Sequence, residues 1–530
     1  MTALVERRDG TDTPGSPPAR RRPPWRDGLL RLGLAAAAPL VWGNAAGLWT
    51  PRGPMTATQA LAAMLISLAV GVAVGVLLRS RWALLLGPVC FAAMFELTRL
   101  STTGPLVDGI HLSEYGLFAL VTGRGFHGLL TLAPILLGAV GGAALARRSQ
   151  RRTHRTEPDA PARGPWGRVG AVLRGGVAVL TGLALVALAA AVAVPARTDP
   201  VLAADGGPLA GSVAELVEVE VGGHDLSMMV RGNSTDNPVL LLLAGGPGGT
   251  ELGAMRHHGQ RLEEDFVVVT WDQRGTGKSA DQLDPTGTMT LQAAVDDTVE
   301  VSEHLRERFG QDRIYLLGQS WGSILGVLAV QQRPDLFAAF IGSGQMVSPR
   351  VTDQITYADT LVWAEDTGDT DLVDRMLTAG PPPYEVMLDY ETTLSSEPDV
   401  YPYDHSANAE GPGQMSEGIF VGEYSLIEKV HNLGGFLDTA SVLYPQIQDI
   451  DFRVDAASLD VPVYLFQGRH EAASRAGLAQ EWFALLEAPR KQLVVAETSG
   501  HRPLWEQPEE FADFMVGTVL AETSGPAAAP

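Results

Sequence analysis

Cysteine is almost absent from this chain, since Cys90 is the only one among 530 residues. A disulfide within the chain is therefore excluded, and any part that folds outside the cytoplasm must depend on a large hydrophobic core. Nucleotide-binding fingerprints are absent too. The glycines at 245–249 have no G-x-G-x-x-G register, and the segment ending at Lys278 and Ser279 carries Asp272 where a P-loop needs its first glycine. We therefore expect no cofactor.

Basic residues are scarce in the second part of the chain. Residues 1–195 hold 20 Lys and Arg against 9 Asp and Glu, a net charge of +11, whereas the remainder holds 19 against 52, a net charge of −33. So negative a surface argues against nucleic acid as a partner and against lying flat on an anionic membrane leaflet. The chain is also too long for one compact core, so we expect at least two structural units.

The first part is dominated by apolar runs. Each is close to the roughly 20 residues that a helix needs to cross a bilayer. A signal peptide is an alternative for the first run only, because four more follow it. We predict five membrane spans in contact with lipid, at Leu29–Trp49, Ala57–Leu78, Trp82–Leu97, Gly128–Ala146 and Val169–Val194.

The arginines of this part predict its orientation. They gather in the leader, in the turn after the second run and in the link before the fifth, whereas the other two loops hold only Arg52, Arg99 and Arg124. Cytoplasmic loops carry the excess of Lys and Arg, so the N-terminus is predicted to be cytoplasmic. Five crossings then place everything after Val194 outside the cytoplasm, in a multi-pass cell-membrane protein.

The second part has the pattern of an α/β domain. An alternating hairpin at 213–230 is followed by six short, continuously apolar runs separated mostly by helical patterns, which is typical of a mostly parallel sheet covered on both faces. The alternation breaks between about 346 and 450, where we expect a helical cap over the sheet. The expected division is a leader (1–28), an all-α membrane bundle (29–195), a linker (196–212), an α/β core (213–345 and 451–521), a cap (346–450) and a disordered tail (522–530).

A nucleophile elbow is predicted at Gly318-Gln319-Ser320-Trp321-Gly322. An apolar run precedes this G-x-S-x-G sequence and a helical pattern follows it, so the chain must turn sharply there and expose the Ser320 hydroxyl. The Trp321 amide at the helix start is one candidate oxyanion donor. The Gly246 amide, in the glycine loop after an earlier strand, is the other.

The residues that would activate Ser320 follow it in the order acid, then histidine. His501 stands after the last apolar run, where a general base can reach Ser320, and Glu471 follows the preceding run and can orient the imidazole. Metal ligation by His470, Glu471 and His501 is the alternative, but these residues lack metal-ligand spacing. We therefore predict a Ser-His-Glu triad without a metal.

These motifs together resemble the proline iminopeptidase family of α/β-hydrolases. The resemblance rests on the glycine-proline loop, the D-Q-R-G-x-G-x-S loop, the elbow G-x-S-W-G-S and the closing S-G-H, and it runs from about Val213 to Leu520. Two positions depart from the family pattern: Ala244 replaces a histidine and Glu471 replaces an aspartate. The resemblance also implies that cap carboxylates hold the substrate amine, and Glu423 with Tyr424 is similar to one such site.

The expected function is a membrane-anchored serine hydrolase that acts outside the cytoplasm. The resemblance favours an aminopeptidase that releases an N-terminal residue, with proline as one candidate, through an acyl-enzyme. An esterase or amidase on small or lipid-like ligands could use the same triad. A non-catalytic binding or sensor module is the third alternative, which the intact triad disfavours.

Overall fold

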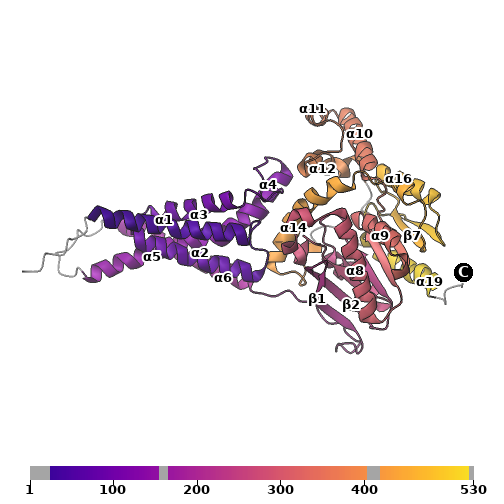
Figure 1. Ribbon diagram of the computed structural model, residues 1–530, viewed down its shortest axis with the longest axis horizontal. Helices are drawn as coiled ribbons and strands as arrows, with labels where there is room; N and C mark the ends of the chain where they lie inside the picture. Colours follow the sequence, from indigo (N-terminus) through magenta and orange to yellow (C-terminus); the bar gives the residue numbers. More distant parts are fainter. Residues whose placement is uncertain (1–23, 154–164, 403–417, 525–530) are drawn as a thin grey trace, which may run out of the picture.

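The computed structural model of the protein describes residues 24–153, 165–402 and 418–524. In Figure 1 an elongated helical bundle, which holds the N-terminal part of the chain, joins at one end a wider unit of helices and strands. Most of the expected leader and of the expected tail lies outside the described residues.

The bundle contains the apolar runs of the sequence as helices. In the described part of the chain, four helical stretches are long and apolar enough to cross a membrane: Gly28–Trp49, Ala57–Leu78, Glu114–Gln150 and Val172–Val192. The run expected as the third span forms a helix of 16 residues, which is shorter than the roughly 20 usually required. The helices are α1 (Pro24–Trp49), α2 (Ala57–Leu78), α3 (Ala83–Thr98), α4 (Glu114–Leu120), α5 (Phe126–Thr153) and α6 (Pro165–Val192).

Small residues let the bundle helices approach closely. A Cβ on Gly71 of α2 would lie 2.1 Å from the backbone oxygen of Ile135, and one on Gly138 of α5 would lie 2.3 Å from that of Leu68. Helices in lipid associate through such close packing, because lipid offers no hydrophobic driving force. In Figure 1 the helices run side by side, so that the 79–82 turn and the N-terminal ends of α1 and α6 lie at the end remote from the α/β unit.

The second unit is built on one eight-stranded sheet with the order β1-β2-β4-β3-β5-β6-β7-β8. The pairs β1–β2 and β2–β4 are antiparallel, and the other five pairs are parallel. The predicted α/β fold with a mostly parallel sheet is confirmed. The strands are β1 (Val213–Val221), β2 (His224–Gly232), β3 (Val239–Leu243), β4 (Val267–Trp271), β5 (Ile314–Gln319), β6 (Phe337–Ser343), β7 (Val463–Gly468) and β8 (Lys491–Ala496).

The continuous apolar runs form strands because both faces of the sheet are covered. On β3, Leu241 and Leu243 belong to one buried cluster, whereas Leu240 and Leu242 belong to another on the opposite face. Side chains alternate along a strand, so a strand buried on both faces must be apolar throughout. The flanking helices include α7 (Leu252–His258), α8 (Leu291–Phe309), α9 (Trp321–Gln332), α16 (Ala473–Leu485), α17 (Pro503–Glu506) and α18 (Pro508–Phe514).

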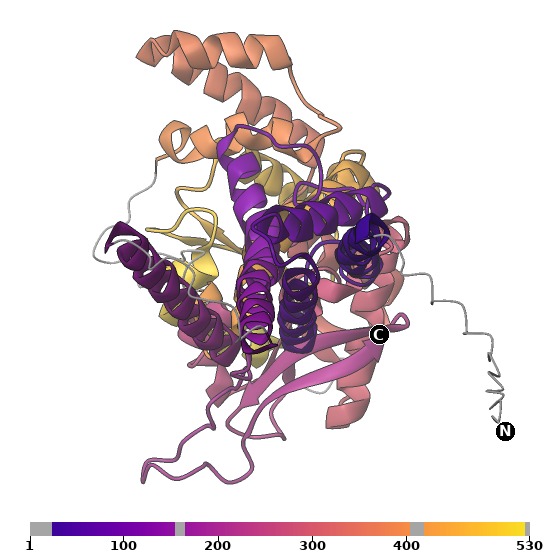
Figure 2. The same ribbon diagram turned by 90° about the vertical axis from the view of Figure 1, so that its left-hand side faces the viewer.

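Helices inserted between β6 and β7 lie beside the end of the bundle. They are α10 (Pro349–Thr367), α11 (Thr370–Ala379), α12 (Glu391–Val400) and α14 (Leu426–Leu443). Figure 2, which looks along the bundle, shows the α10–α11 pair projecting away from it. In Figure 1, α12 and α14 lie next to α4. Of the inserted helices, α12 and α14 thus lie where the bundle meets the α/β unit.

Candidate active site

The turn between β5 and α9 holds Ser320 in an unusual backbone conformation. Its φ of 52° and ψ of −116° are rarely adopted by a residue with a side chain. Two glycines make the turn sterically feasible. A Cβ on Gly318 would lie 2.4 Å from the oxygen of Gly322, and a Cβ on Gly322 would lie 2.0 Å from the oxygen of Leu243. The G-x-S-x-G spacing therefore has a direct steric cause.

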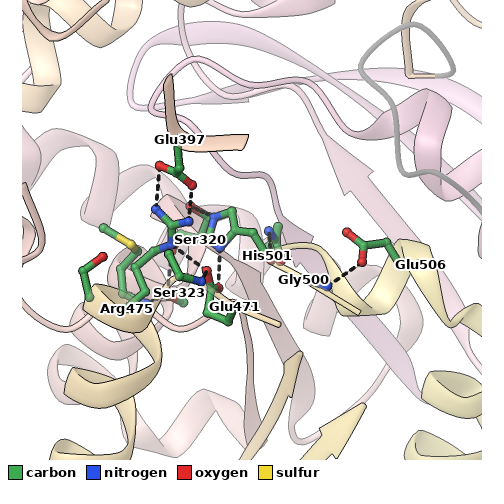
Figure 3. Close-up of polar contacts among 12 residues, drawn as sticks. Ser320, Ser323, Glu397, Glu471, Arg475, Gly500, His501 and Glu506 are labelled. Carbon is green, nitrogen blue, oxygen red and sulfur yellow. Dashed lines mark hydrogen bonds and ion pairs between the residues drawn. The ribbon is translucent and has the colours of Figure 1, made fainter. Parts of the chain in front are cut away.

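Three side chains from different loops meet at this turn (Figure 3). His501 Nε2 lies 3.0 Å from Ser320 Oγ, and His501 Nδ1 lies 2.6 Å from Glu471 Oε2. Ser320 follows β5, Glu471 follows β7 and His501 follows β8, so all three stand at the carboxyl edge of the parallel strands. The structure thus brings together the three residues that the sequence placed in a triad.

Glu471 is held as a buried anion. Its Oε1 accepts hydrogen bonds from the Ala472 amide and from Arg475 Nε, both at 2.8 Å. Burial alone would raise the pKa of Glu471, but the charges of Arg475 and His501 outweigh it and hold this pKa at about 2. Glu471 is therefore ionised near neutral pH.

Two further residues, Arg475 and Glu397, take part in this arrangement, although neither was predicted from the sequence. Arg475 on α16 bonds Glu471 and also makes two hydrogen bonds to Glu397 on α12, one of them from Nη1 to Oε2 at 3.2 Å. Figure 3 shows this guanidinium between the two carboxylates. The spacing of four residues between Glu471 and Arg475 is a signal that the sequence contained. No comparable signal pointed to Glu397, which is 78 residues away.

The expected oxyanion donors, the Trp321 and Gly246 amides, belong to segments that adjoin Ser320. Trp321 is the first residue of α9, where a backbone amide has no acceptor within the helix. The glycine loop packs against the elbow, since a Cβ on Gly245 would lie 3.4 Å from Ser320 Cβ. Gly246 follows directly and lines the same cavity as Ser320. Trp321 at the start of α9 and Gly246 in the loop after β3 thus both belong to segments that adjoin Ser320.

Gln273 connects the glycine loop to the elbow. It bonds the loop at Ala244, the position that departs from the histidine of the family pattern. Its Nε2 donates to the backbone oxygen of Ala244 at 3.4 Å, and its Oε1 accepts a hydrogen bond from Trp321 Nε1 at 3.0 Å. Gln273 comes from the D-Q-R-G-x-G-x-S loop after β4. This side chain therefore supplies hydrogen bonds beside Ala244, which has no polar side chain of its own.

Ser320 lies in a cavity of about 480 Å³, a size suited to a small ligand or a short peptide. Most of its wall is apolar or aromatic. Charged side chains gather near the triad, where Glu397 is paired with Arg475, and Glu251 lies 3.7 Å from Arg502. The apolar and aromatic lining comprises Tyr115, Pro247, Met346, Met387, Tyr390, Leu394, Pro398, Tyr401, Ile419, Phe436, Ala440, Tyr444 and Ala472.

Glu423 and Tyr424 do not line this cavity. Glu423 is almost fully buried and forms an ion pair with Arg256 Nε at 3.2 Å, at the edge of a separate depression. Tyr424 is buried, and its hydroxyl donates to Asp272 Oδ1 at 2.8 Å. Their expected role in binding a substrate amine beside Ser320 is therefore not supported by where they lie.

Comparisons with known proteins identify the family of the α/β unit. Residues 239–366 match the model of the family described as "Serine aminopeptidase, S33". A probable aminopeptidase of Bacillus subtilis, YbaC, is 31% identical over 311 residues, which cover 57% of this chain and 96% of that protein. A probable proline iminopeptidase of Leptolyngbya boryana is 24% identical over 295 residues, which cover 52% of this chain and 85% of that protein.

Among solved structures, the proline iminopeptidase of Mycobacterium smegmatis is similar at 21% identity and a TM-score of 0.43, over 58% of this chain and 100% of that one. The family assignment rests on the sequence relatives, because the Bacillus protein is matched over nearly its whole length. The chain is a serine hydrolase that belongs to the serine aminopeptidase family of α/β-hydrolases, together with the proline iminopeptidases.

Proposed function

We propose that the protein is a membrane-anchored aminopeptidase in which Ser320, His501 and Glu471 form the catalytic triad. The observation that carries this proposal is the continuous hydrogen-bonded series from Ser320 Oγ to His501 and on to Glu471, at 3.0 Å and 2.6 Å. A base within hydrogen-bond reach of a hydroxyl, itself oriented by a carboxylate, is the arrangement that activates a serine nucleophile.

The reaction would proceed through an acyl-enzyme. His501 Nε2 takes the proton of Ser320 as Oγ attacks the substrate carbonyl, and the ionised Glu471 stabilises the imidazolium that results. The amides of Trp321 and Gly246 donate to the developing oxyanion. His501 then gives its proton to the leaving amine. Water, activated by the same imidazole, attacks the ester and releases the N-terminal residue.

The nucleophile is tested with the full-length protein in detergent micelles. Ser320→Ala and His501→Ala should each remove nearly all turnover, because triad members act as a unit and the catalysis left without them is only ~10³ to 10⁴ over water. A fluorophosphonate probe should label the wild type and not Ser320→Ala. Undiminished turnover by the serine variant would refute the assignment.

The substrate class is tested by blocking the amine. An aminopeptidase should cleave aminoacyl anilides with a free amine, proline among them, and lose most of its kcat/KM when the amine is acetylated. Esterase activity is the second candidate, because two of the acids in the cavity, Glu251 and Glu397, already lie beside arginines and much of the wall is apolar. Equal cleavage of acetylated substrates or of simple acyl esters would favour the esterase.

We also propose that the α/β unit lies outside the cytoplasm. The arginines of the 79–82 turn, and those near the C-terminal end of α5, lie at the end of the bundle remote from the sheet. The positive-inside rule places that end in the cytoplasm. A reporter active only outside the cytoplasm, fused after Pro530, should therefore give signal, and a cytoplasmic reporter at the same position should not. The reverse result would overturn this orientation.

A further inference from the structure

The cavity that contains Ser320 is not built by the α/β unit alone. Tyr115 lines it, and Tyr115 belongs to α4, the short helix between α3 and α5 of the bundle. In Figure 1, α4 lies at the end of the bundle beside α12 and α14. The part of the chain expected to anchor the enzyme therefore also reaches the wall of the candidate active site.

Tyr115 is held against the cap by a hydrogen bond. Its backbone amide donates to Glu391 Oε1 at 3.1 Å. Glu391 is the first residue of α12, and three other residues of this helix, Leu394, Glu397 and Pro398, line the same cavity. Ser113 caps α4, with its hydroxyl accepting from the Gly116 amide at 3.1 Å. The start of α4 is thus fixed relative to the wall on which the substrate would lie.

A second helix, α14, is shared between the bundle and the cavity. Phe436 lines the cavity and also packs with Tyr115 around Leu106, Val107 and Leu437. Two residues later, Asp438 accepts a hydrogen bond from the Leu106 amide at 3.0 Å. The junction is close enough that a Cβ on Gly434 would lie 2.8 Å from Leu106 Cδ2.

Buried charges hold the same junction together. Arg52, in the loop between α1 and α2, bonds Asp438 of α14 and also bonds Asp284 of the α/β unit at 3.1 Å through Nε. His431 Nε2 lies 2.7 Å from the backbone oxygen of Pro54. Buried and paired groups of this kind cannot separate without a large cost in desolvated, unpaired charge. The position of Tyr115 is therefore set by the junction as a whole.

We propose that Tyr115 is a specificity-determining residue, through which the membrane region limits the size of the apolar group that the Ser320 cavity accepts. Much of the cavity wall besides Tyr115 is apolar or aromatic, so the group that contacts Tyr115 would be an apolar N-terminal side chain or acyl group. A ring in the wall excludes volume, and truncating it opens the cavity toward α4. This inference rests on Ser320 being the nucleophile, as proposed above.

The test compares substrates that differ only in the size of the apolar group. Full-length wild type, Tyr115→Ala, Tyr115→Phe and Tyr115→Trp are assayed in detergent micelles with anilides of alanine, leucine, phenylalanine and tryptophan. The ratio of kcat/KM for the largest substrate, the tryptophan anilide, to kcat/KM for the smallest, the alanine anilide, should rise at least about tenfold in Tyr115→Ala. A small change in the size of an apolar group changes the selectivity of an apolar pocket by one to two orders of magnitude. Tyr115→Phe should keep the wild-type ratio, and Tyr115→Trp should lower it.

Leu117→Ala is the matched control, because Leu117 is on the same helix, is 46% exposed and is not among the cavity-lining residues. Its selectivity should equal that of the wild type. Labelling by a small fluorophosphonate reports the reactivity of Ser320 independently of the substrate. Wild type that is not labelled would mean that the proposed nucleophile is wrong.

Labelled variants with unchanged selectivity would instead overturn the role of Tyr115. If Tyr115→Ala is not labelled because the junction between the bundle and the α/β unit is disrupted, the selectivity of Tyr115→Trp tests the role of Tyr115. An unchanged ratio in that labelled variant also overturns the proposal.

Discussion

Arg475 Nε lies 2.8 Å from Glu471 Oε1, on the opposite side of the carboxylate from His501. The same guanidinium bonds Glu397 of α12, so one cation neutralises both the acid beside His501 and an acid of the cap. Burial alone would raise the pKa of Glu397, but Arg475 keeps it below its usual value. Arg475 is therefore a candidate positioning residue that acts through Glu471.

Arg475→Met should change the pH dependence of stability. In the wild type, the depressed pKa of Glu471, about 2 against 4.5, contributes stability that is fully present above 4.5 and is lost as the pH falls toward 2. Without Arg475, two buried carboxylates lose their cation, and the free energy of unfolding near neutral pH should fall by about 3 to 5 kcal/mol. Burial then raises both pKa values, so acidification should relieve part of this loss.

The measurement is denaturant unfolding of wild type and variant in the same detergent, between about pH 3 and pH 7. The difference in free energy of unfolding should shrink as the pH falls. Arg469→Met is the control, because Arg469 pairs with Glu497 on the exposed surface, where an ion pair contributes only ~0 to 1 kcal/mol. A pH-independent difference for Arg475→Met would contradict the electrostatic role.

Glu471→Gln should lower kcat strongly while the fold persists. An amide can still accept the hydrogen bond from Arg475, but it cannot stabilise the imidazolium that forms at His501, and in a related triad the corresponding change costs ~10⁴ in kcat. Glu471→Asp keeps the charge and should retain measurable turnover. Equal kcat values for wild type, Glu471→Gln and Glu471→Asp would show that the acid of the triad lies elsewhere.

Gly322→Ala should destabilise the elbow. The new Cβ would lie 2.0 Å from the backbone oxygen of Leu243, and neither backbone can move without disturbing β3 or α9. Overpacking of this kind typically costs ~1 to 3 kcal/mol, and here it should also abolish fluorophosphonate labelling. The control is Gly477→Ala on α16, where a Cβ meets no atom within 4 Å and helix propensity should raise stability by about 0.5 to 1 kcal/mol.

Arg52→Ala should loosen the junction between the bundle and the α/β unit. It leaves Asp438 buried without its cation, which should cost about 3 to 5 kcal/mol, and adding Asp438→Asn should recover part of this loss. Burial already raises the pKa of Asp438 to about 6 despite Arg52, so the destabilisation should also shrink at lower pH. Arg81→Ala, at the exposed turn at the far end of the bundle, is the control. Limited proteolysis at the junction gives an independent measurement.

Local patterns in the sequence were sufficient to predict the fold and the elbow. Continuous apolar runs predict strands buried on both faces, and β3 begins and ends where its run does, at Val239 and Leu243. The elbow could be predicted because its two glycines are required by steric contacts within the pentapeptide itself and with one neighbouring strand, β3. The order of Ser320, Glu471 and His501 along the chain is likewise linear information, because each follows its own strand.

Contacts between distant segments were decided only by the tertiary structure. We expected the Glu423 carboxylate to bind a substrate amine beside Ser320, but in the folded chain Glu423 pairs with Arg256 and does not line the Ser320 cavity. Glu397 is instead connected to Glu471, through Arg475. Tyr115 meets Glu391 across 276 residues, because the end of the bundle docks on the cap. Periodicity reports which face of an element is buried, but not which partner buries it. The partners of Glu423, Glu397 and Tyr115 therefore depended on how the bundle, cap and sheet pack together.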